Sequence, residues 1–509
     1  MRFLFTISLF LLLLIIAVSA PPPPNKGKDK KDVAAKKKEQ TGKEVESAPA
    51  GAKGKPAAKK KSRIAELKEK LKNKGKGKGK GGKLNEVPPG WDKPKKRKQL
   101  HDEDKQKIKN SCAGKKNGCK GQSKKTKEHK MKNKERMVEA RLRRLGKNST
   151  EDQAKVEQEV ERQLEKIFEA KKAVQEAMGV SVNEVEPEDD GLWQEDMVLT
   201  VEQAERIVEI AKENVSSDSP PELPQLGDSP KVRRKRFSFF LEKNITKKWE
   251  NSTIPIVLDD YFFATEKAAI LDALTDIERK SCIRFSLQKE VPDIPHILYL
   301  KDQSLFRCGS SLMGRVGDQN LLWLTFAGNC SKVIRGTVIH ETMHALGVDH
   351  HHIRYDRNSK LAIDYSNLEP QMMTLYQEGD ADSFTSYGIP YDYFSIMHYD
   401  AYAGATNGSK PVMTAVQEPS EFFTQAMGQR LGLSDNDANM LRKMYCMPGC
   451  QDTRVHCGWW STIGYCSQHP DNMLEYCPKS CGFCPEAQIL EALEKASAKE
   501  SSEPAFTFF

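Results

Sequence analysis

One eleven-residue stretch that begins at His340 constrains this chain more than any other. It reads H-E-x-x-H-x-x-G-x-x-H, and on a helix His340 and His344 lie one turn apart on the same face. Two imidazole nitrogens at this spacing can bind one zinc ion, and Glu341 lies beside them without being a ligand. Gly347 favours the left-handed conformation that ends a helix, so the chain can turn back and His350 can supply a third nitrogen. The pattern therefore predicts a zinc site with one coordination position left open for water.

The alternative to a metal site is an ordinary amphipathic helix that carries two histidines by chance. The chain has only 11 histidines in 509 residues, so a chance match to all eleven positions is far rarer than a match to H-E-x-x-H alone. A second motif supports the zinc interpretation. Ser395-Ile-Met-His-Tyr399 has the form of the methionine turn that lies beneath the metal in the metzincin class of zinc proteases.

The S-x-M-H-Y form of that turn resembles the astacin family of metzincins, and two other stretches do the same. Residues 350–357 are similar to the astacin sequence H-E-x-x-R-x-D-R, and Gly428–Ser434 is similar to its later G-Q-R-x-x-L-S. The resemblance covers residues 237–446. It implies an α+β fold, namely a two-lobed metzincin catalytic domain whose upper lobe contains a twisted, mainly antiparallel sheet.

The resemblance also implies an activity and assigns roles to the matched residues. The activity is hydrolysis of peptide bonds, with one catalytic Zn²⁺ bound by His340, His344 and His350. Glu341 would be the general base, and Tyr399 would be a switchable fifth ligand that later stabilises the oxyanion.

Three further positions near this site are informative. By resemblance, Met397 would lie beneath the metal, and Arg430 would bind substrate by favouring acidic residues just after the cleaved bond. The family usually has a glutamate directly after the third zinc histidine, where it pairs with the trimmed N-terminus. Here that residue is His351, and a neutral imidazole cannot make the same ion pair. One alternative is that His351 or the following His352 competes for the metal, but we expect His351 to face solvent.

The first 20 residues predict a secretory signal peptide. An apolar run spans residues 3–18, and the small residues at the end of Ala17-Val-Ser-Ala20 suit signal peptidase. A membrane anchor is the alternative, but the run is short for a bilayer span and the flank that follows is densely basic. We therefore expect a secreted, extracellular protein without a membrane span in its mature form.

Residues 21–130 are rich in Lys, Gly and Pro and have very few large apolar side chains, so we expect a disordered pro-region. This arm carries much of the excess of Lys and Arg over Asp and Glu that gives the chain its net charge of +10. Secretion argues against nucleic acid as a partner, and contact with matrix or acidic glycans suits the lysines better. A merely solvated segment is the simplest interpretation. Cys112 and Cys119 can pair locally.

Residues 131–236 are expected to form a helical propeptide with a processing site at its end. Met131–Met178 is rich in Glu, Lys, Arg, Ala, Leu and Val, which is typical of long solvated helices. Four consecutive basic residues follow a proline-rich stretch, and in a secreted chain they indicate cleavage by a processing protease; these are Arg233, Arg234, Lys235 and Arg236. A surface basic cluster is the alternative.

A latency motif is expected between those helices and the processing site. Residues 192–200 resemble the astacin pro-segment motif F-x-G-D-(hydrophobic)-x-L-T, whose aspartate binds the catalytic zinc and displaces its water. The match makes Asp196 the zymogen zinc ligand. Trp193 replaces Phe and Glu195 replaces Gly, so a side chain must fit where the family has none. Asp228, in Leu-Gly-Asp, is the alternative latency residue.

From residue 237 the pattern is that of a globular domain. One helix, at 265–280, has helical apolar spacing, and four segments have strand patterns: Thr253–Asp259, Ile283–Leu287, His296–Leu300 and Leu321–Phe326. With the motif helix, this order fits an α+β half-domain whose sheet forms one wall of a cleft. A substrate peptide can add to the edge of such a sheet as an extended strand. Residues 351–446 would form a less regular lower half.

Twelve cysteines in a secreted chain indicate disulfides rather than a metal cluster. In the protease segment, the astacin resemblance implies the pairs Cys282–Cys446 and Cys308–Cys330. The last six cysteines have the spacing C-x6-C-x8-C-x10-C-x3-C-x2-C over residues 450–484, which resembles the ShKT module. That resemblance implies the pairs Cys450–Cys484, Cys457–Cys477 and Cys466–Cys481.

The ShKT-like module is too small to fold without its bridges. Its toxin relatives block potassium channels through a Lys-Tyr pair, but Asp471 and Asn472 occupy those positions here, so a role in binding substrate or matrix is the better interpretation. Trp459 and Trp460 either form its contact patch or pack within it. Residues 485–509 are a short tail without an assignable role. An astacin-like domain followed by this module resembles nematode enzymes.

Two functions of different classes follow from the sequence. The first is a secreted zinc endopeptidase, made as a latent zymogen, that hydrolyses extracellular proteins of matrix, cuticle or eggshell. The second is a weakly active or inactive protease scaffold whose ShKT-like module acts in extracellular binding. The complete set of metal ligands and the general base favour the first.

Overall fold

The computed structural model describes residues 91, 99–145, 150–215, 246–302, 307–379, 385–447, 449–454 and 456–485. The signal peptide expected at 1–20, most of the basic arm, Asp228, the processing residues 233–236 and the tail beyond 485 lie outside these residues. Among the helices within the described ranges, none has both the length and the apolar character that crossing a bilayer requires.

The main sheet has six strands in the order β2-β6-β7-β5-β3-β4: β2 (Met197–Val198), β3 (Thr253–Leu258), β4 (Arg284–Leu287), β5 (His296–Lys301), β6 (Gly309–Leu312) and β7 (Gln319–Leu324). Only β6 and β7 pair antiparallel, and the other four neighbouring pairs are parallel. The expectation of a mainly antiparallel sheet is therefore wrong. Helix α7 (Ala264–Lys280) joins β3 to β4, and a crossover through a helix returns the chain in the same direction.

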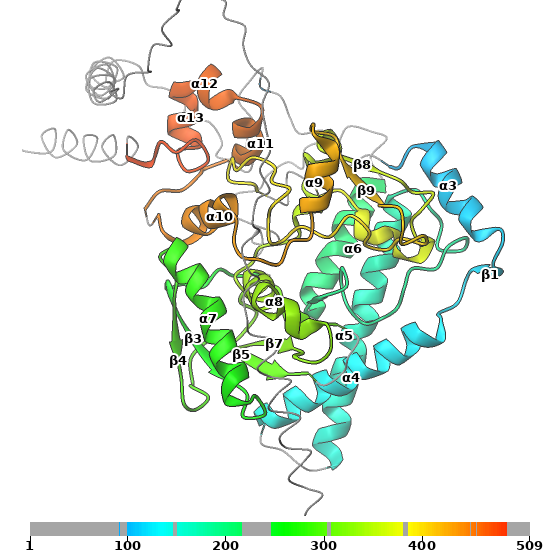
Figure 1. Ribbon diagram of the computed structural model, residues 1–509, viewed down its shortest axis with the longest axis horizontal. Helices are drawn as coiled ribbons and strands as arrows, with labels where there is room; N and C mark the ends of the chain where they lie inside the picture. Colours follow the sequence, from blue (N-terminus) through cyan, green and yellow to red (C-terminus); the bar gives the residue numbers. More distant parts are fainter. Residues whose placement is uncertain are drawn as a thin grey trace, which may run out of the picture. The chain divides into compact units, whose positions relative to one another are not determined.

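Helices α7 and α8 (Cys330–Ala345) cover one face of this sheet, and Figure 1 shows α7 alongside β3 and β4. The alternation of side chains along a strand separates the two faces. Ile297 and Tyr299 of β5 pack in the core that contains α7 and α8, whereas Leu298 and Leu300 belong to a second cluster. Both faces of the sheet are thus buried, which suits its parallel strands.

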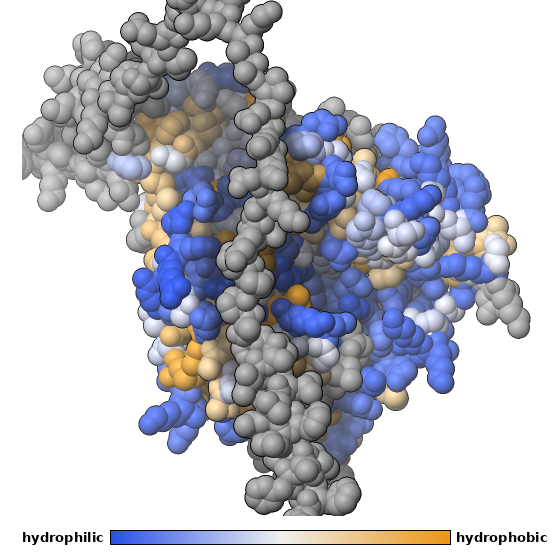
Figure 2. Space-filling model, viewed as in Figure 1, coloured by the Kyte–Doolittle hydropathy of each residue, from blue (hydrophilic) through white to orange (hydrophobic). Residues whose placement is uncertain are grey.

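The second face of the sheet is covered by helices that precede residue 237, the part of the chain we call the pro-region. These are α4 (Lys124–Leu145) and α5 (Thr150–Ala177), whose Met137, Val160 and Leu164 pack with Leu300 and Trp323 of the sheet. Their outer faces are hydrophilic (Figure 2). The helices expected here are therefore solvated on one side only.

The pro-region folds further toward the N-terminus than its composition indicates. Helix α3 (Asp102–Cys112), strand β1 (Lys116–Cys119) and the first turns of α4 lie in the segment expected to be disordered, so that expectation is wrong for residues 102–130. The Cys112–Cys119 disulfide and the fully buried Ile108 anchor this segment in a core shared with the lower half of the molecule. Helix α6 (Val201–Val215) completes the described pro-region.

The lower half is less regular. It contains the small sheet of β8 (Leu361–Ile363) and β9 (Met413–Ala415), the 3-10 helices η2 (His351–Ile353), η3 (Arg357–Ser359) and η4 (Pro370–Tyr376), and the helices α9 (Ser420–Ala426) and α10 (Asp435–Tyr445). Three short helices, α11 (Cys457–Thr462), α12 (Tyr465–Gln468) and α13 (Pro470–Tyr476), form the ShKT-like module. The twelve cysteines form six disulfides: Cys112–Cys119, Cys282–Cys446, Cys308–Cys330, Cys450–Cys484, Cys457–Cys477 and Cys466–Cys481.

Candidate metal centre

The last turns of α8 and the segment after it bring three histidines together. His340 and His344 lie on one face of α8, and both are buried. The helix ends where Gly347 adopts a φ of 94°, with the Gly347 N–H bonded to the His344 carbonyl at 2.8 Å. The chain then turns back, so that the ring centroid of His350 lies 4.6 Å from that of His344.

The hydrogen bonds of the three rings fix the nitrogen that each presents to the centre. The Nδ1 atom of His340 lies 2.8 Å from the Ile396 carbonyl oxygen, and that of His344 lies 2.8 Å from the Val348 carbonyl oxygen. The Nδ1 atom of His350 lies 2.9 Å from Gln194 Oε1. These oxygens only accept, so each Nδ1 carries the hydrogen and each neutral ring turns a bare Nε2 toward the centre.

A carboxylate from the pro-region lies among these nitrogens. Asp196 Oδ2 is 3.1 Å from His350 Nε2 and 3.3 Å from His340 Nε2, and Asp196 Oδ1 is 3.7 Å from His344 Nε2. One ligand atom from each of the four residues lies within 4.8 Å of the others. Asp196 Oδ1 is buried without a hydrogen-bond partner. Four converging lone-pair donors require a cation, and three imidazoles with one oxygen ligand fit zinc.

The electrostatics of the four groups suit metal binding, which needs neutral imidazoles and an ionised carboxylate. Burial lowers the pKa of His340 to about 4 and lowers that of His344 well below its usual value. Burial alone would raise the pKa of Asp196, but the close approach of the His350 and His340 rings outweighs burial and brings it well below 3.8, so the carboxyl group is ionised.

Glu341 lies between this centre and the edge of the sheet. Its side chain is only 3 % exposed, and burial together with the charge of Asp196 raises its pKa well above 4.5. A Cβ atom added to Gly309 at the start of β6 would lie 2.6 Å from Glu341 Cγ and Oε1. The absence of a side chain at Gly309 therefore lets the strand approach the Glu341 carboxyl group.

Tyr399 and Met397 both belong to the methionine turn, Ser395–Tyr399. The Tyr399 hydroxyl donates a hydrogen bond to the Gln194 carbonyl of the pro-region, and its ring centroid lies 4.4 Å from that of His350. Burial raises the pKa of Tyr399 well above 10, so the hydroxyl keeps its hydrogen. Met397 is fully buried, and its carbonyl accepts a hydrogen bond from the His351 N–H at 2.9 Å.

Arg430 lies against the same turn. Its Nη1 donates to the carbonyl oxygens of Ile396 and His398 at 3.2 and 3.3 Å. Its positive charge partly offsets the rise in the pKa of Glu341 and adds to the effect of burial in lowering the pKa of His340. The guanidinium thus supports the backbone that holds His340, and its role toward substrate stays a prediction.

The expectation that His351 faces solvent is wrong. Its side chain is 9 % exposed, and its Nε2 accepts a hydrogen bond from the Asp392 N–H at 2.9 Å. Helix η2 turns the ring inward against Tyr391, with centroids 4.8 Å apart. The next residue, His352, is fully buried as well.

An ion-pair network explains how Glu195 fits at a position where the family motif has glycine. Glu195 adopts a φ of 67°, and its carboxylate points to Arg307, with Oε1 3.4 Å from Nη1. Arg307 also binds the buried carboxylate of Asp190 at 2.8 Å, and Lys171 binds the other oxygen of Asp190 at 2.7 Å. The network ties the pro-region to the segment before β6.

Asp437 supports the methionine turn from α10 and was missed by sequence reasoning. Its carboxylate accepts hydrogen bonds from Ser395 Oγ at 2.6 Å and from the Ile396 N–H at 2.8 Å. Asp437 also forms a capping box with Ser434 at the start of α10. The sequence S-x-x-D before that helix is a signal that could have located it.

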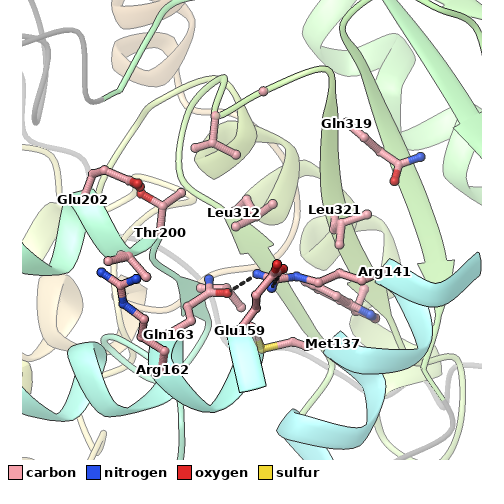
Figure 3. Close-up of a pocket in the computed structure, with 15 residues that line it drawn as sticks. Met137, Arg141, Glu159, Arg162, Gln163, Thr200, Glu202, Leu312, Gln319 and Leu321 are labelled. Carbon is pink, nitrogen blue, oxygen red and sulfur yellow. Dashed lines mark hydrogen bonds and ion pairs between the residues drawn. The ribbon is translucent and has the colours of Figure 1, made fainter. Parts of the chain in front are cut away.

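The pro-region also covers the edge of the sheet. Strand β2 pairs parallel with β6, with Met197 opposite Ser311, and the Ser311 N–H donates to the Asp196 carbonyl at 2.9 Å. A cavity of about 330 Å³ lies where α4 and α5 meet β6 and β7, lined by Met137 and Gln163 from the helices and by Leu312 from the sheet (Figure 3). None of the three histidines, His340, His344 and His350, lines this cavity.

Comparison with known proteins gives two family matches. Residues 241–446 match the peptidase family described as Astacin, and residues 449–484 match the family described as ShK domain-like. The zinc metalloproteinase nas-10 of Caenorhabditis elegans is 38 % identical over 306 residues, which are 59 % of this chain and 54 % of that protein. The chain thus spans about half the length of this nematode relative.

Two further similar proteins come from animals outside the nematodes. Seminal metalloprotease 1 of Drosophila melanogaster is 31 % identical over 205 residues, which are 39 % of this chain and 78 % of that protein. The structure of high choriolytic enzyme 1, a hatching enzyme zinc-protease from Oryzias latipes, is 29 % identical in sequence. The matched part is 39 % of this chain and 92 % of the hatching enzyme's chain, and the TM-score is 0.33.

Proposed function

Because the chain belongs to the astacin family of zinc metalloproteinases, we propose that it is a zinc-dependent endopeptidase made as a latent proenzyme. One observation carries the proposal: the Asp196 carboxylate of the pro-region lies among the Nε2 atoms of His340, His344 and His350. A centre that holds a carboxylate of its own pro-region cannot accept substrate until that segment leaves.

The chemistry follows from the residues around the three histidines. A zinc ion held by His340, His344 and His350 would polarise the scissile carbonyl and lower the pKa of the attacking water to about 7. Glu341 accepts the proton of that water and passes it to the leaving amine nitrogen. The Tyr399 hydroxyl, once released from the Gln194 carbonyl, donates a hydrogen bond to the oxyanion, a contribution of about 3–4 kcal/mol.

The substrate peptide takes the place of β2 along β6. The backbone of β6 already binds one extended segment, through the Ser311 N–H and the Asp196 carbonyl, which supports this path. Glu341 faces the start of β6 at Gly309, so a peptide bond held there is close to the general base. Arg430 is proposed to favour an acidic residue just after the cleaved bond.

The same proposal places the enzyme outside the cell. The signal peptide at 1–20 directs secretion, cleavage at Arg233–Arg236 by a processing protease starts maturation, and the substrates are extracellular proteins of matrix, cuticle or eggshell. Six disulfides support an oxidising compartment. The ShKT-like module serves as a binding appendage.

The test compares peptide-library cleavage by the secreted chain before and after the pro-region has been cut at 233–236 and digested away. The Glu341→Ala variant, treated identically, is the control for contaminating proteases. We expect zinc-dependent cleavage only without the pro-region and only with Glu341. A trimmed chain that retains zinc and cleaves nothing would contradict the proposal and would favour a scaffold whose ShKT-like module provides the function.

A further inference from the structure

Trp91 of the basic arm lies against aromatic side chains of the ShKT-like module. Its ring centroid is 4.6 Å from that of Trp460, 5.0 Å from that of Tyr465 and 5.1 Å from that of His469. The rings of Trp460 and Tyr465 meet the indole edge-on, at 88° and 80°, whereas His469 stacks on it at 28°. Edge-to-face and stacked pairs are the geometries that aromatic quadrupoles favour. The indole thus contacts three aromatic rings of the module.

The three rings form a site that the module itself holds in place. We call Trp460, Tyr465 and His469 the aromatic box. Tyr465 and His469 contact each other at 4.8 Å, and the His469 N–H donates to the Tyr465 carbonyl at 2.8 Å. The disulfides Cys457–Cys477 and Cys466–Cys481 join α11 and α12, which carry Trp460 and Tyr465, to the segment that follows α13. A rigid, preformed site loses little entropy when a ligand enters.

The ligand in the box comes from a segment that is otherwise without aromatic residues. Trp91 is the only Phe, Tyr or Trp between residues 21 and 98, and it follows Pro88-Pro-Gly90 in the sequence. Prolines on both sides, at 88–89 and 94, favour an extended peptide. The lone indole of a basic, proline-containing arm therefore occupies the box, and the arm belongs to the pro-region rather than to the module.

We propose that the aromatic box is a peptide-binding site for a tryptophan side chain, with Trp91 as its resident ligand in the full-length chain. The pro-region would then block two sites at once, the metal centre through Asp196 and the box through Trp91. The vacating of the box on maturation rests on the proposed proenzyme, whereas the binding site itself does not. Once vacant, the box takes a tryptophan-bearing extended segment of an extracellular protein and holds the protease on it.

The test uses the full chain with Glu341→Ala, so that the probe is not cleaved, with and without Trp91→Ala. The probe is a fluorescein-labelled peptide with the sequence of residues 85–94, and its binding is followed by fluorescence anisotropy. A tethered ligand competes at an effective concentration in the millimolar range. We therefore expect the Trp91→Ala chain to bind the probe at least tenfold more tightly than the chain that keeps Trp91.

Two variants and a second probe separate the box from other surfaces. His469→Ala, added to Trp91→Ala, should weaken binding at least fivefold, and it removes a partly exposed ring rather than the fully buried Trp460. Phe422→Ala removes an aromatic side chain that is 56 % exposed on α9. Introduced into the chain that keeps Trp91, it should not raise binding of the probe. The probe with alanine in place of tryptophan should not bind.

Equal binding by the chains with and without Trp91, or undiminished binding of the alanine probe, would overturn the inference. The assay uses an uncleaved and catalytically inactive chain. A failure here therefore leaves the proposed protease untouched, and a failure of the protease assay leaves the aromatic box untouched.

Discussion

At the scale of single residues, the proposed latency rests on Asp196. Its carboxylate contacts all three histidines, whereas the rest of the pro-region is held by separate contacts of α4 and α5. We predict that Asp196→Ala raises peptide cleavage at least tenfold once the chain has been cut at 233–236 but not yet digested, because β2 has then lost its link to the centre and a substrate can displace it from β6. Asp189→Ala is the matched control, since Asp189 pairs with Lys130 instead. Equal inactivity of the two cut, undigested variants would contradict this role.

Asp437 adds a pH dependence to the stability of the methionine turn. Burial, partly offset by the hydrogen bonds from Ser395 and Ile396, raises its pKa from 3.8 to about 6. The native state therefore binds more protons than the unfolded state between about pH 4 and pH 6. The stability that protonation contributes is complete below pH 4 and is lost as the pH rises through 6.

A shift of about two pKa units corresponds to about 3 kcal/mol. We predict that the free energy of unfolding of the wild-type chain falls by up to this amount, relative to Asp437→Asn, as the pH rises from 4 to 6.5. Denaturant titrations of both proteins at each pH measure the difference. A difference that does not change with pH would rule out Asp437 as the source.

The residues of the centre differ in how far a sequence can reveal them. His340, Glu341 and His344 lie on one helix, whose geometry converts their spacing into proximity, so the motif predicts their arrangement. Gln194 and Arg307 contact the centre or its neighbours across more than a hundred residues of chain. No local pattern encodes such contacts.

At the scale of elements, the segments with an apolar pattern were predictable, the four-residue β4 included, and those without such a pattern were not. The patterns of β3, β5, β7 and α7 gave each element within one or two residues of its observed bounds, because buried apolar side chains set the period. Strand β6, with the sequence Gly-Ser-Ser-Leu, has no such pattern. The direction of a strand leaves no periodic signal either, and for that reason the parallel sheet was not predicted.

The contact between α4 and the sheet depends on a buried ion pair. Arg136 binds Asp302 at 2.8 Å, both side chains are about 9 % exposed or less, and the guanidinium lies 4.9 Å from the Trp323 ring centroid. We predict that Arg136→Ala lowers the free energy of unfolding by about 3–5 kcal/mol, because it removes the guanidinium that binds Asp302 and packs on the Trp323 ring at this buried contact. Urea denaturation of the full chain measures the loss.

The control for this prediction is an exposed pair between α4 and α5. Lys134 and Glu161 are 36 % and 39 % exposed and lie 2.7 Å apart, so Lys134→Ala should cost less than about 1 kcal/mol. Similar losses for Arg136→Ala and Lys134→Ala would show that the buried pair does not hold α4 on the sheet.

At the scale of the whole molecule, the pro-region and the protease domain share two hydrophobic cores. One lies between α4, α5 and the sheet, and the other joins α3, α5 and α6 to the lower half. We predict that a cut at 233–236 leaves the pro-region bound, so that the two fragments co-elute in size-exclusion chromatography until the pro-region is digested. Separate elution directly after the cut would show that the shared cores do not hold the fragments together.

The central claim is that three histidines build a zinc site, which native mass spectrometry of the purified full-length chain tests most directly. The account predicts one zinc ion per wild-type chain, loss of that ion in His344→Ala, and full retention in His101→Ala, which removes an exposed histidine before α3. The absence of zinc from the wild-type chain, or equal zinc content in the two variants, would contradict it.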